Sequence, residues 1–469
     1  REEMSDDEWV RITTLGCCRE VGRAAFILST PETRILIDCG DKPGAEGEVP
    51  YLQVPEALGA GAATLDAVIL THAHLDHSAL VPLLFKYGYD GPIYTTEPTR
   101  DLMGLLTLDY LDVAAKDGRT PPYESAQVRD AIKHTIPLEY GDVTDVAPDV
   151  KLTFHNAGHI LGSAVTHFHI GDGLYNVAFS GDIHYEDTRL FNGAVNDFPR
   201  VETLVLESTY GGRNDYQTDQ EDSEEALKEV INETYEQGGK VVIPAFAVGR
   251  SQEIMLVLEE AMREGEIPEM PVHLDGMIWE ATAIHTTYPE YLRDDLRDRI
   301  FHEDENPFLA DQFNHIDAGE DERQEVADGD ECIVISTSGM IEGGPIMSWL
   351  RHIGPDPDSN LVFVGYQAQG TLGRRIQNGW DEIPVDGWGG GSRGDTLTLE
   401  MGVEVVDGFS GHADRQGLEN FVKTMNPRPE KVLCVHGDES SVQDLSSSLY
   451  HDYNMRTFAP KNLETFRFK

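Results

Sequence analysis

The chain has 469 residues, enough for about three domains and for a sizeable core without disulfide bonds. Apolar residues make up 40% and charged residues 26%, but 84 acidic against 36 basic side chains give a net charge of −48. Such a charge repels nucleic acid at low salt, yet it is also typical of a protein that works in molar salt, where the Debye length is only about 3 Å. We favour this halophilic interpretation over an acidic protein with basic partners, so the charge does not exclude a nucleic-acid ligand.

The five cysteines form no CxxC pair, which excludes a zinc ribbon and a disulfide scaffold. This cysteine usage indicates a reduced protein, which we expect in the cytoplasm. No apolar run approaches the roughly 20 residues of a membrane span, and the acidic residues 1–8 do not form a signal peptide. We therefore expect no membrane association.

In chain order, the first third alternates short apolar runs with turns. Residues 24–28 and 34–38 flank the turn Pro31-Glu32-Thr33 and predict a β-hairpin. Residues 67–70 predict a buried strand, and residues 75–87 have the apolar spacing of a helix. Further strands are predicted at residues 151–155, 165–170, 176–180 and 203–207.

The middle of the chain changes to helices alternating with buried strands, a pattern that favours a parallel sheet. Helices are predicted at residues 223–238 and 251–264, and strands at residues 240–244, 272–275, 332–336 and 361–365. The acidic residues 317–330 predict a solvated helix or loop. The last part returns to strands, predicted at residues 396–400, 404–407 and 431–436.

The segment Thr71-His72-Ala73-His74-Leu75-Asp76-His77 has the strongest chemical signal in the chain. It follows a buried strand, and in extended backbone the side chains of His72 and His74 point the same way. Asp76 and His77 then open the next helix, so two groups of ligands can face one cavity. Histidine and carboxylate are the ligands that zinc takes when it keeps an open position. The sequence therefore predicts a metal site here.

Three further candidate ligands each follow a predicted strand. His159 lies in Ala157-Gly158-His159, Asp182 in Ser180-Gly181-Asp182, and His436 in Val435-His436-Gly437. Each is a weak signal alone, because a polar residue after a strand is common. Together they predict polar ligands at one edge of successive strands, which is how an α/β sandwich builds a site.

The motif HxHxDH, followed by a lone His, then SGD and a late His, resembles the metallo-β-lactamase superfamily. The resemblance implies two Zn²⁺ ions per chain. It implies that His72, His74 and His159 hold one ion, that Asp76, His77 and His436 hold the other, and that Asp182 bridges them. A pair of zinc ions can activate a water molecule and stabilise both oxygens of an in-line displacement.

Three features narrow the superfamily to one branch. More than half of the chain separates Asp182 from His436, which indicates an inserted α/β domain. The segments Leu206-Glu207-Ser208-Thr209-Tyr210-Gly211 and Gly408-Phe409-Ser410-Gly411-His412-Ala413-Asp414 resemble motifs A and B of the β-CASP nucleases, with His436 as motif C. The implied fold is α/β: an αββα metallo-β-lactamase sandwich with an inserted β-CASP domain. We assign residues 1–211 and 390–469 to the sandwich and residues 212–389 to the insert.

The resemblance extends over essentially the whole chain to archaeal homologues of the cleavage and polyadenylation specificity factor nuclease. It is carried by segments such as Pro244-Ala245-Phe246-Ala247-Val248-Gly249-Arg250 and Ser336-Thr337-Ser338-Gly339-Met340. It implies endonucleolytic RNA cleavage in 3′-end processing or transcription termination, and it allows 5′–3′ exonuclease trimming. RNA-processing or transcription machinery is the implied partner. Longer members have KH-type domains upstream. No GxxG-bearing KH unit precedes the first predicted strand here, so we expect those domains to be absent or to have been cut away.

The motifs also imply individual roles. Asp76 would orient the attacking water, and His412 would act as general acid toward the departing 3′ oxygen. Glu207 would keep the imidazole of His412 protonated. We expect phosphate contacts from a glycine-rich turn and two arginines; the predicted RNA-binding residues are Arg250, Ser336, Ser338, Gly339, Met340 and Arg374.

Two other functions compete with a ribonuclease. A small-molecule metallohydrolase, such as a lactonase or thioesterase, would not need the long insert or motif B. A catalytically inactive RNA-binding scaffold would not need every ligand position filled.

The C-terminal residues 459–469 contain Leu463, Phe466 and Phe468, which a free solvated tail would not normally have. One interpretation is an edge strand on the sandwich. The other is a contact across a two-fold axis, because the tail resembles the Asn-Leu-Glu segment used for dimer formation in this group. We expect a homodimer.

Overall fold

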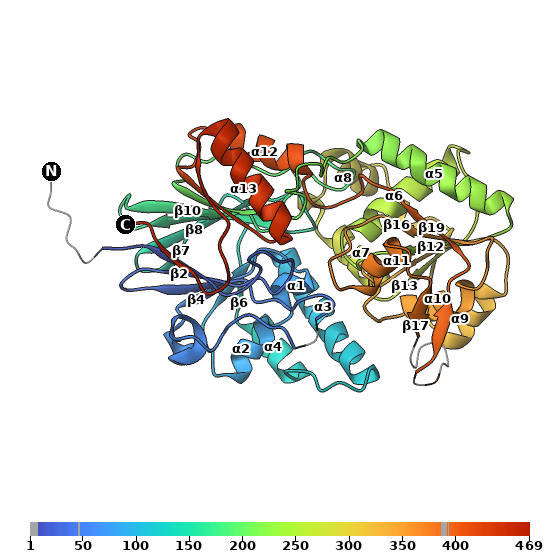
Figure 1. The fold of residues 1–469 in the computed structure, drawn as a ribbon, viewed down its shortest axis with the longest axis horizontal. Helices are drawn as coiled ribbons and strands as arrows, with labels where there is room; N and C mark the ends of the chain where they lie inside the picture. Colours follow the sequence, from blue (N-terminus) through green and yellow to red (C-terminus); the bar gives the residue numbers. More distant parts are fainter. Residues whose placement is uncertain (1–7, 46, 386–391, 393) are drawn as a thin grey trace. The chain divides into compact units, whose positions relative to one another are not determined.

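A computed structural model describes residues 8–45, 47–385, 392 and 394–469 (Figure 1). The chain divides into two compact units. The first combines Arg1–Tyr216 with His412–Lys469, and the second is Gln217–Gly411. The predicted boundary between residues 389 and 390 falls on residues 386–391, outside the described part, and the predicted domain limits stay a prediction.

One sheet of the first unit has the order β22-β1-β2-β3-β4-β5-β6. Its strands are β1 (Arg11–Thr14), β2 (Phe26–Ser29), β3 (Arg34–Ile37), β4 (Ala67–Ile69), β5 (Ile93–Thr95), β6 (Thr135–Pro137) and β22 (Thr465–Arg467). The predicted hairpin is confirmed as β2 and β3, which pair antiparallel, whereas β3 to β6 run parallel.

The other sheet of this unit has the order β21-β20-β11-β10-β9-β8-β7. Its strands are β7 (Val143–Ala147), β8 (Val150–Asn156), β9 (Ala164–Ile170), β10 (Tyr175–Phe179), β11 (Thr203–Glu207), β20 (Lys431–Val435) and β21 (Arg456–Phe458). Neighbours among β10, β11 and β20 are parallel, so the carboxyl ends of these three strands meet at one edge. Strands predicted near residues 151–155, 165–170, 176–180, 203–207 and 431–436 are all present.

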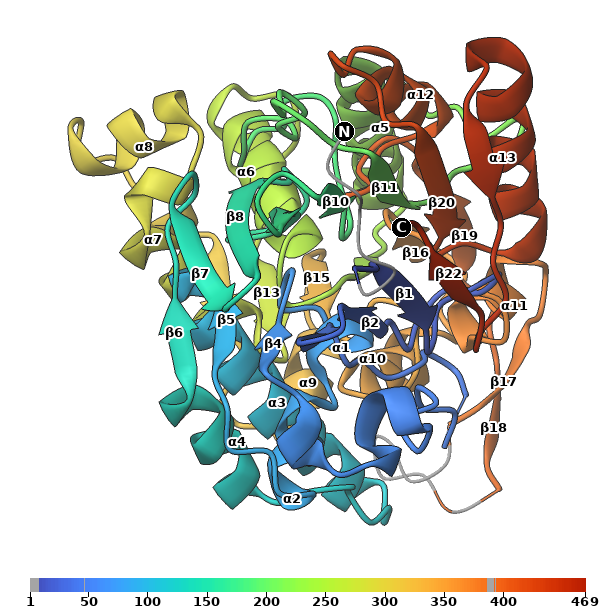
Figure 2. The same cartoon turned by 90° about the vertical axis from the view of Figure 1, so that its left-hand side faces the viewer.

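Helices cover the outer face of each sheet, which makes the αββα sandwich that the sequence predicts (Figure 2). They are α1 (Leu75–Ser78), α2 (Val81–Lys86), α3 (Glu97–Lys116), α4 (Ser125–Lys133), α12 (Arg415–Lys423) and α13 (Glu439–Tyr453). The alternation along β3 shows why: Ile35 and Ile37 belong to the core between the sheets, and Leu36 belongs to the core beneath α2 and α4. A third core joins the other sheet to α12 and α13.

The helix predicted over residues 75–87 is two helices, which is a correction. Here α1 ends at Ser78, and α2 begins at Val81. Pro82 has no N–H to donate to the carbonyl of Ser78, so the hydrogen-bond ladder of α1 cannot continue. The break leaves Asp76 and His77 on a single short turn.

The second unit has a sheet of order β14-β13-β15-β12-β16-β19 in which every pairing is parallel, as predicted. Its strands are β12 (Val241–Pro244), β13 (Val272–Asp275), β14 (Phe313–His315), β15 (Ile333–Ser336), β16 (Asn360–Phe363) and β19 (Gly402–Val405). A small antiparallel pair joins β17 (Glu382–Pro384) to β18 (Thr396–Thr398).

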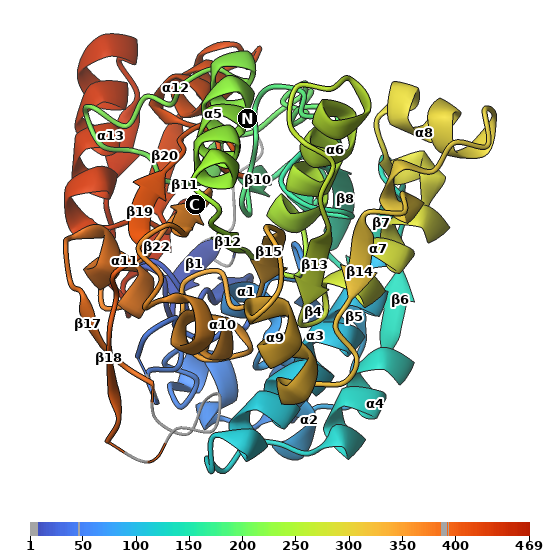
Figure 3. The same ribbon diagram turned by 90° about the vertical axis from the view of Figure 1, so that its right-hand side faces the viewer.

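Helices lie on both sides of this parallel sheet, with α5 and α6 on one side and α9 and α10 on the other (Figure 3). The helices of the unit are α5 (Gln220–Glu236), α6 (Arg250–Arg263), α7 (Ile278–Thr287), α8 (Asp294–Phe301), α9 (Glu320–Ala327), α10 (Ile346–Ile353) and α11 (Leu372–Gln377). The acidic residues 317–330 contain α9, none of whose residues is buried, which confirms a solvated helix.

The C-terminal tail forms the edge strand β22, which pairs antiparallel with β1. Phe466 lies opposite Ile12, and the rings of Phe466 and Phe468 pack against the core between the two sheets. The edge-strand interpretation of these apolar residues is therefore confirmed, while the dimer stays a prediction. None of the helices in the described part of the chain combines the length and apolar character that crossing a membrane requires.

Candidate metal centre

The HxHxDH segment changes from extended chain to helix directly after β4. His74 is the residue before α1 and has extended geometry, with φ −54° and ψ 142°. Asp76 and His77 follow on the first turn of α1. The local structure is thus as the spacing predicts: two histidines on an extended loop and two further ligand-type side chains on a helical turn. His72 and His77 are buried.

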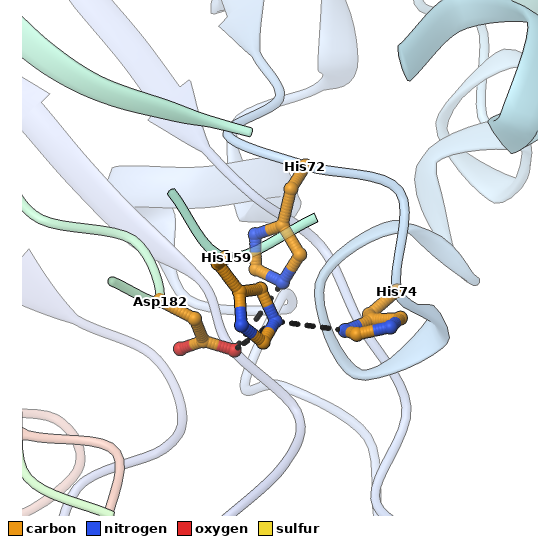
Figure 4. A group of neighbouring side chains, drawn as sticks. All are labelled: His72, His74, His159 and Asp182. Carbon is orange, nitrogen blue, oxygen red and sulfur yellow. Dashed lines mark hydrogen bonds and ion pairs between the residues drawn. The ribbon is translucent and has the colours of Figure 1, made fainter. Parts of the chain in front are cut away.

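A first group of donor atoms comes from His72, His74, His159 and Asp182 (Figure 4). One ligand atom from each lies within 4.8 Å of the others. His159, from the loop between β8 and β9, has its Nε2 3.0 Å from Nδ1 of His74. Asp182 follows β10, and its Oδ2 lies 3.2 Å from Nε2 of His72.

A second group comes from Asp76, His77, Asp182 and His436, within the same 4.8 Å limit. Nε2 of His77 lies 3.3 Å from Nε2 of His436 and 3.3 Å from Oδ2 of Asp182. Nε2 of His436 lies 3.0 Å from Oδ2 of Asp76. Asp182 belongs to both groups, which is the position that a bridging ligand requires.

The donor set fits a pair of metal ions. Oδ1 of Asp182 is buried and has no hydrogen-bond partner among the described residues, and buried Nε2 of His72 has only its ion-pair contact to Oδ2 of Asp182. Leaving such atoms unpaired costs about 1–3 kcal/mol each, a cost that a coordinated cation removes. Imidazole nitrogens and carboxylate oxygens in a closed group suit zinc. The predicted metal residues His72, His74, Asp76, His77, His159, Asp182 and His436 therefore all lie where ligands would.

Side chains outside these groups orient the histidines, and sequence analysis missed them. Asp38 accepts hydrogen bonds from the N–H and hydroxyl of Thr71, both at 2.8 Å, and lies 2.8 Å from Nδ1 of His77. Thr209 Oγ1 lies 3.1 Å from Nδ1 of His436. Such partners fix the tautomer and direction of a ligating ring. A signal for Asp38 existed, since it follows an apolar strand as Asp182 does.

Glu207 and His412 form a pair beside the two groups. Nδ1 of His412 lies 3.0 Å from Oε1 and 3.1 Å from Oε2 of Glu207, which is buried at the end of β11. Burial by itself lowers the pKa of His412, but the charges of Glu207 and Asp182 outweigh it and raise the pKa to about 9. Asp182, Glu207 and His412 also meet the distance limit of a metal group, so geometry permits either role for His412.

The predicted glycine-rich turn lies after β15 in the second unit. Ser338 Oγ donates to the carbonyl of Gly343 and accepts from the N–H of Glu342, at 2.9 and 2.8 Å. Gly339 lies so close to Phe246 that a Cβ would meet its backbone nitrogen at 2.9 Å. Ser336 is the buried last residue of β15, and Met340 is buried as well.

The two predicted phosphate-binding arginines lie at the starts of different helices of the second unit. Arg250 begins α6, is buried, and donates to the carbonyl of Phe409 at 2.9 Å. Arg374 lies in α11 and donates to the carbonyl of Gln367 at 3.1 Å. The Gly373 N–H donates to the carbonyl of Met340, so α11 adjoins the glycine-rich turn. Phosphate contacts from these residues stay a prediction.

Three family models match this chain. The metallo-β-lactamase superfamily matches residues 19–236, the Beta-Casp domain matches residues 251–376, and the Zn-dependent metallo-hydrolase RNA specificity domain matches residues 396–460. A solved structure, described as a protein of unknown function from Enterococcus faecalis V583, shares the fold with a TM-score of 0.54 and 13% identity. The match covers 98% of this chain and 100% of the chain of that structure. The fold and the donor groups thus define a metallohydrolase of the metallo-β-lactamase superfamily.

The similar curated proteins include archaeal proteins named transcription termination factor FttA. That of Methanosarcina mazei is 59% identical over 100% of this chain and 73% of its own length. Those of Methanothermobacter thermautotrophicus and Thermococcus kodakarensis are each 51% identical, over 99% and 100% of this chain and 72% and 73% of their own lengths. The chain belongs to the β-CASP family, in the archaeal group related to the cleavage and polyadenylation specificity factor.

Proposed function

We propose that this protein is a zinc-dependent ribonuclease that holds two Zn²⁺ ions per chain. The observation that carries the proposal is the pair of donor groups that share Asp182, with the Glu207–His412 pair directly beside them. An inactive RNA-binding scaffold would have no use for two complete donor groups and a paired imidazole. The family assignment supports a hydrolase.

RNA is the proposed substrate. The similar proteins are named transcription termination factors, and residues 396–460 match a model described as an RNA specificity domain. Both support endonucleolytic cleavage during RNA 3′-end formation or transcription termination, with 5′–3′ exonuclease trimming as a second mode. The transcription or RNA-processing machinery is the proposed partner.

His72, His74 and His159 would hold one ion, Asp76, His77 and His436 would hold the other, and Asp182 belongs to both donor groups. Two bound zinc ions supply an activated water and neutralise charge on the phosphoryl oxygens. Asp38 contacts Nδ1 of His77 and Thr209 contacts Nδ1 of His436, and these contacts fix the orientation of the two rings. Asp76 would orient the attacking water in addition to serving as a ligand.

The proton for the leaving 3′ oxygen comes from His412. Its Nδ1 donates to Glu207, and the second proton of the imidazolium, on Nε2, is the one that passes to the leaving oxygen. Glu207 is itself held by the N–H of Ile183, which donates to Oε1 at 2.8 Å. The pair therefore enters each cycle with a fixed ring and a proton in place.

Substrate phosphates bind to the second unit through the turn at Ser336, Ser338, Gly339 and Met340 and through Arg250 and Arg374. A net charge of −48 opposes long-range attraction of RNA to the protein as a whole. Localised phosphate contacts and the metal ions then carry the affinity, in molar salt. A dimer through the C-terminal tail and the domain limits 1–211, 212–389 and 390–469 belong to the same proposal.

The proposal is tested with a 5′-labelled RNA and with chromogenic lactone, thioester and β-lactam substrates, in parallel at molar KCl. We expect internal RNA fragments and no turnover of the small molecules. Turnover of a small substrate without RNA cleavage would favour the small-molecule hydrolase, and RNA binding without any cleavage would favour the scaffold. If mononucleotides are the only products, the protein acts as an exonuclease and the proposed endonuclease activity is wrong.

A further inference from the structure

The C-terminal segment before β22 is fastened to the loop that follows β1. The carbonyl of Ala459 accepts from Nε and Nη2 of Arg19, at 3.1 and 2.9 Å. The hydroxyl of Thr14 donates to the carbonyl of Lys461 at 2.8 Å, and the N–H of Leu463 donates to the carbonyl of Thr14 at 2.7 Å. These contacts involve the backbone of the segment, so they persist when its side chains are changed.

Asn462 adds two contacts that depend on its side chain. Its Oδ1 accepts from the N–H of Cys18 at 3.0 Å, and its Nδ2 donates to Oε1 of Glu20 at 3.0 Å. Glu20 is also bound by Arg23 and Lys42. The amide of Asn462 thus spans the loop from residue 18 to residue 20 and completes the set of partners around a half-buried carboxylate.

The same loop holds the backbone of a predicted metal ligand. The N–H of His436 donates to the carbonyl of Cys17 at 2.7 Å, and the N–H of Gly437 donates to the carbonyl of Glu20 at 3.1 Å. His436 has a φ of 50°, a left-handed conformation that costs a non-glycine residue about 1–2 kcal/mol. Such a conformation persists only where the surroundings hold it, and here the loop supplies two of those contacts.

We propose that Asn462 is a positioning residue for His436, so that the C-terminal segment supports the metal centre from outside. The chain of contacts runs from the Asn462 amide to the loop of residues 17–20, and from the loop carbonyls to the N–H groups of His436 and Gly437. Without the side-chain amide of Asn462, β22 still pairs with β1 through its backbone, but the loop of residues 17–20 becomes more mobile. His436 then loses the fixed backbone that directs its ring toward Asp76 and His77.

The first test needs no metal and measures hydrogen exchange in the chelator-treated full chain. Asn462→Ala should speed exchange of the His436 and Gly437 amides by about tenfold or more, because their acceptors become mobile. Exchange in β13 and β14 of the second unit should not change. Lys461→Ala is the matched control, because the Lys461 side chain is exposed and Lys461 contacts Thr14 through its backbone carbonyl. Unchanged exchange at His436 and Gly437 in Asn462→Ala would overturn the proposal.

The second test titrates Zn²⁺ alone into the chelator-treated chain, and it rests on the proposed two-metal site. Loss of a supporting contact typically costs 10- to 100-fold in metal affinity. Asn462→Ala should therefore weaken one of two binding events by about tenfold or more, and Lys461→Ala should weaken neither. Equal weakening of both events, or of neither, would overturn the role of Asn462. Fewer than two events in the parent chain would instead count against the proposed function.

A second variant keeps both tests decisive if Asn462→Ala fails to fold. Asn462→Asp retains an acceptor for the Cys18 N–H but places a carboxylate against Glu20 in place of a donor. It should loosen Gly437, whose acceptor is the carbonyl of Glu20, more than His436, whose acceptor is the carbonyl of Cys17. If both amides exchange at the same rates in Asn462→Asp as in the parent chain, the proposal is contradicted.

Discussion

Glu207 presents both of its carboxylate oxygens to Nδ1 of His412, at 3.0 and 3.1 Å. The pair joins two parts of the chain that are 205 residues apart, one at the end of β11 and one just before α12. Because Glu207 also accepts the N–H of Ile183, its carboxylate cannot rotate freely toward another partner. A ring held in this way is suited to act as a proton donor rather than as a metal ligand.

Replacing His412 should separate proton donation from metal binding. We expect His412→Ala to slow RNA cleavage by about 10²- to 10⁴-fold, the usual contribution of a general acid, while zinc content stays near that of the parent chain. Asp182→Ala should lose zinc and activity together, because Asp182 belongs to both donor groups. Zinc content by mass spectrometry and single-turnover cleavage measure the two effects. If His412→Ala strips zinc, then His412 is a ligand through the group it forms with Asp182 and Glu207.

The carboxylate of Glu207 should set the alkaline limit of activity. Burial opposes the charge on His412, but Glu207 and Asp182 raise its pKa to about 9, so the ring keeps its proton at neutral pH. Cleavage should therefore fall only as the pH rises through about 9. In Glu207→Gln the pKa of His412 is lower, and the fall should begin at least about one pH unit earlier. A pH–rate profile with the same alkaline limit in both proteins would contradict this role.

Salt should stabilise the fold. Self-repulsion of 84 acidic against 36 basic side chains destabilises the compact state in dilute buffer, and screening relieves it. We expect the melting temperature to rise by several degrees between millimolar and molar KCl, with most of the rise complete once the Debye length is about 3 Å. Differential scanning calorimetry gives the profile, and a flat one would remove the halophilic interpretation.

The proposed dimer can be tested without disturbing β22. Leu463 is 47% exposed and has a φ of 69°, which asparagine adopts more readily than leucine. Leu463→Asn should keep the backbone and remove only the apolar side chain. If that side chain packs against a second copy, burying its remaining exposed half is worth about 1 kcal/mol in each of the two subunits, and the dimer should weaken by roughly tenfold or more. Light scattering at molar KCl measures this, and a monomeric parent chain at micromolar concentration would end the proposal.

Much of the centre could be predicted because its ligands follow strands. The order β20-β11-β10 brings together the carboxyl ends that precede His436, Glu207 and Asp182. Spacing alone grouped His72, His74, Asp76 and His77. It could not show that β20 pairs with β11, since more than 200 residues separate them and only the folded sheet sets that register.

Other features could not be predicted for physical reasons. The 20-residue helix α3 was missed because its buried face includes Gly104 and Thr107, which blur the apolar period, although Thr96 caps it by accepting from the N–H of Thr99. The apolar tail fitted an edge strand and a dimer contact equally, because both bury alternate side chains. Asn462 lies in the Asn-Leu-Glu segment that suggested a dimer contact, but nothing in the sequence indicated a role toward His436, because that role depends on a loop more than 440 residues away.

Activity as a function of zinc per chain tests the central claim most directly. Zn²⁺ is added stepwise to the chelator-treated protein, bound metal is measured by mass spectrometry, and cleavage of a 5′-labelled RNA is followed at each step. The two donor groups that share Asp182 predict saturation at two ions per chain, with cleavage rising as the second ion binds. Full cleavage by the metal-free chain, or no cleavage with two ions bound, would contradict the assignment.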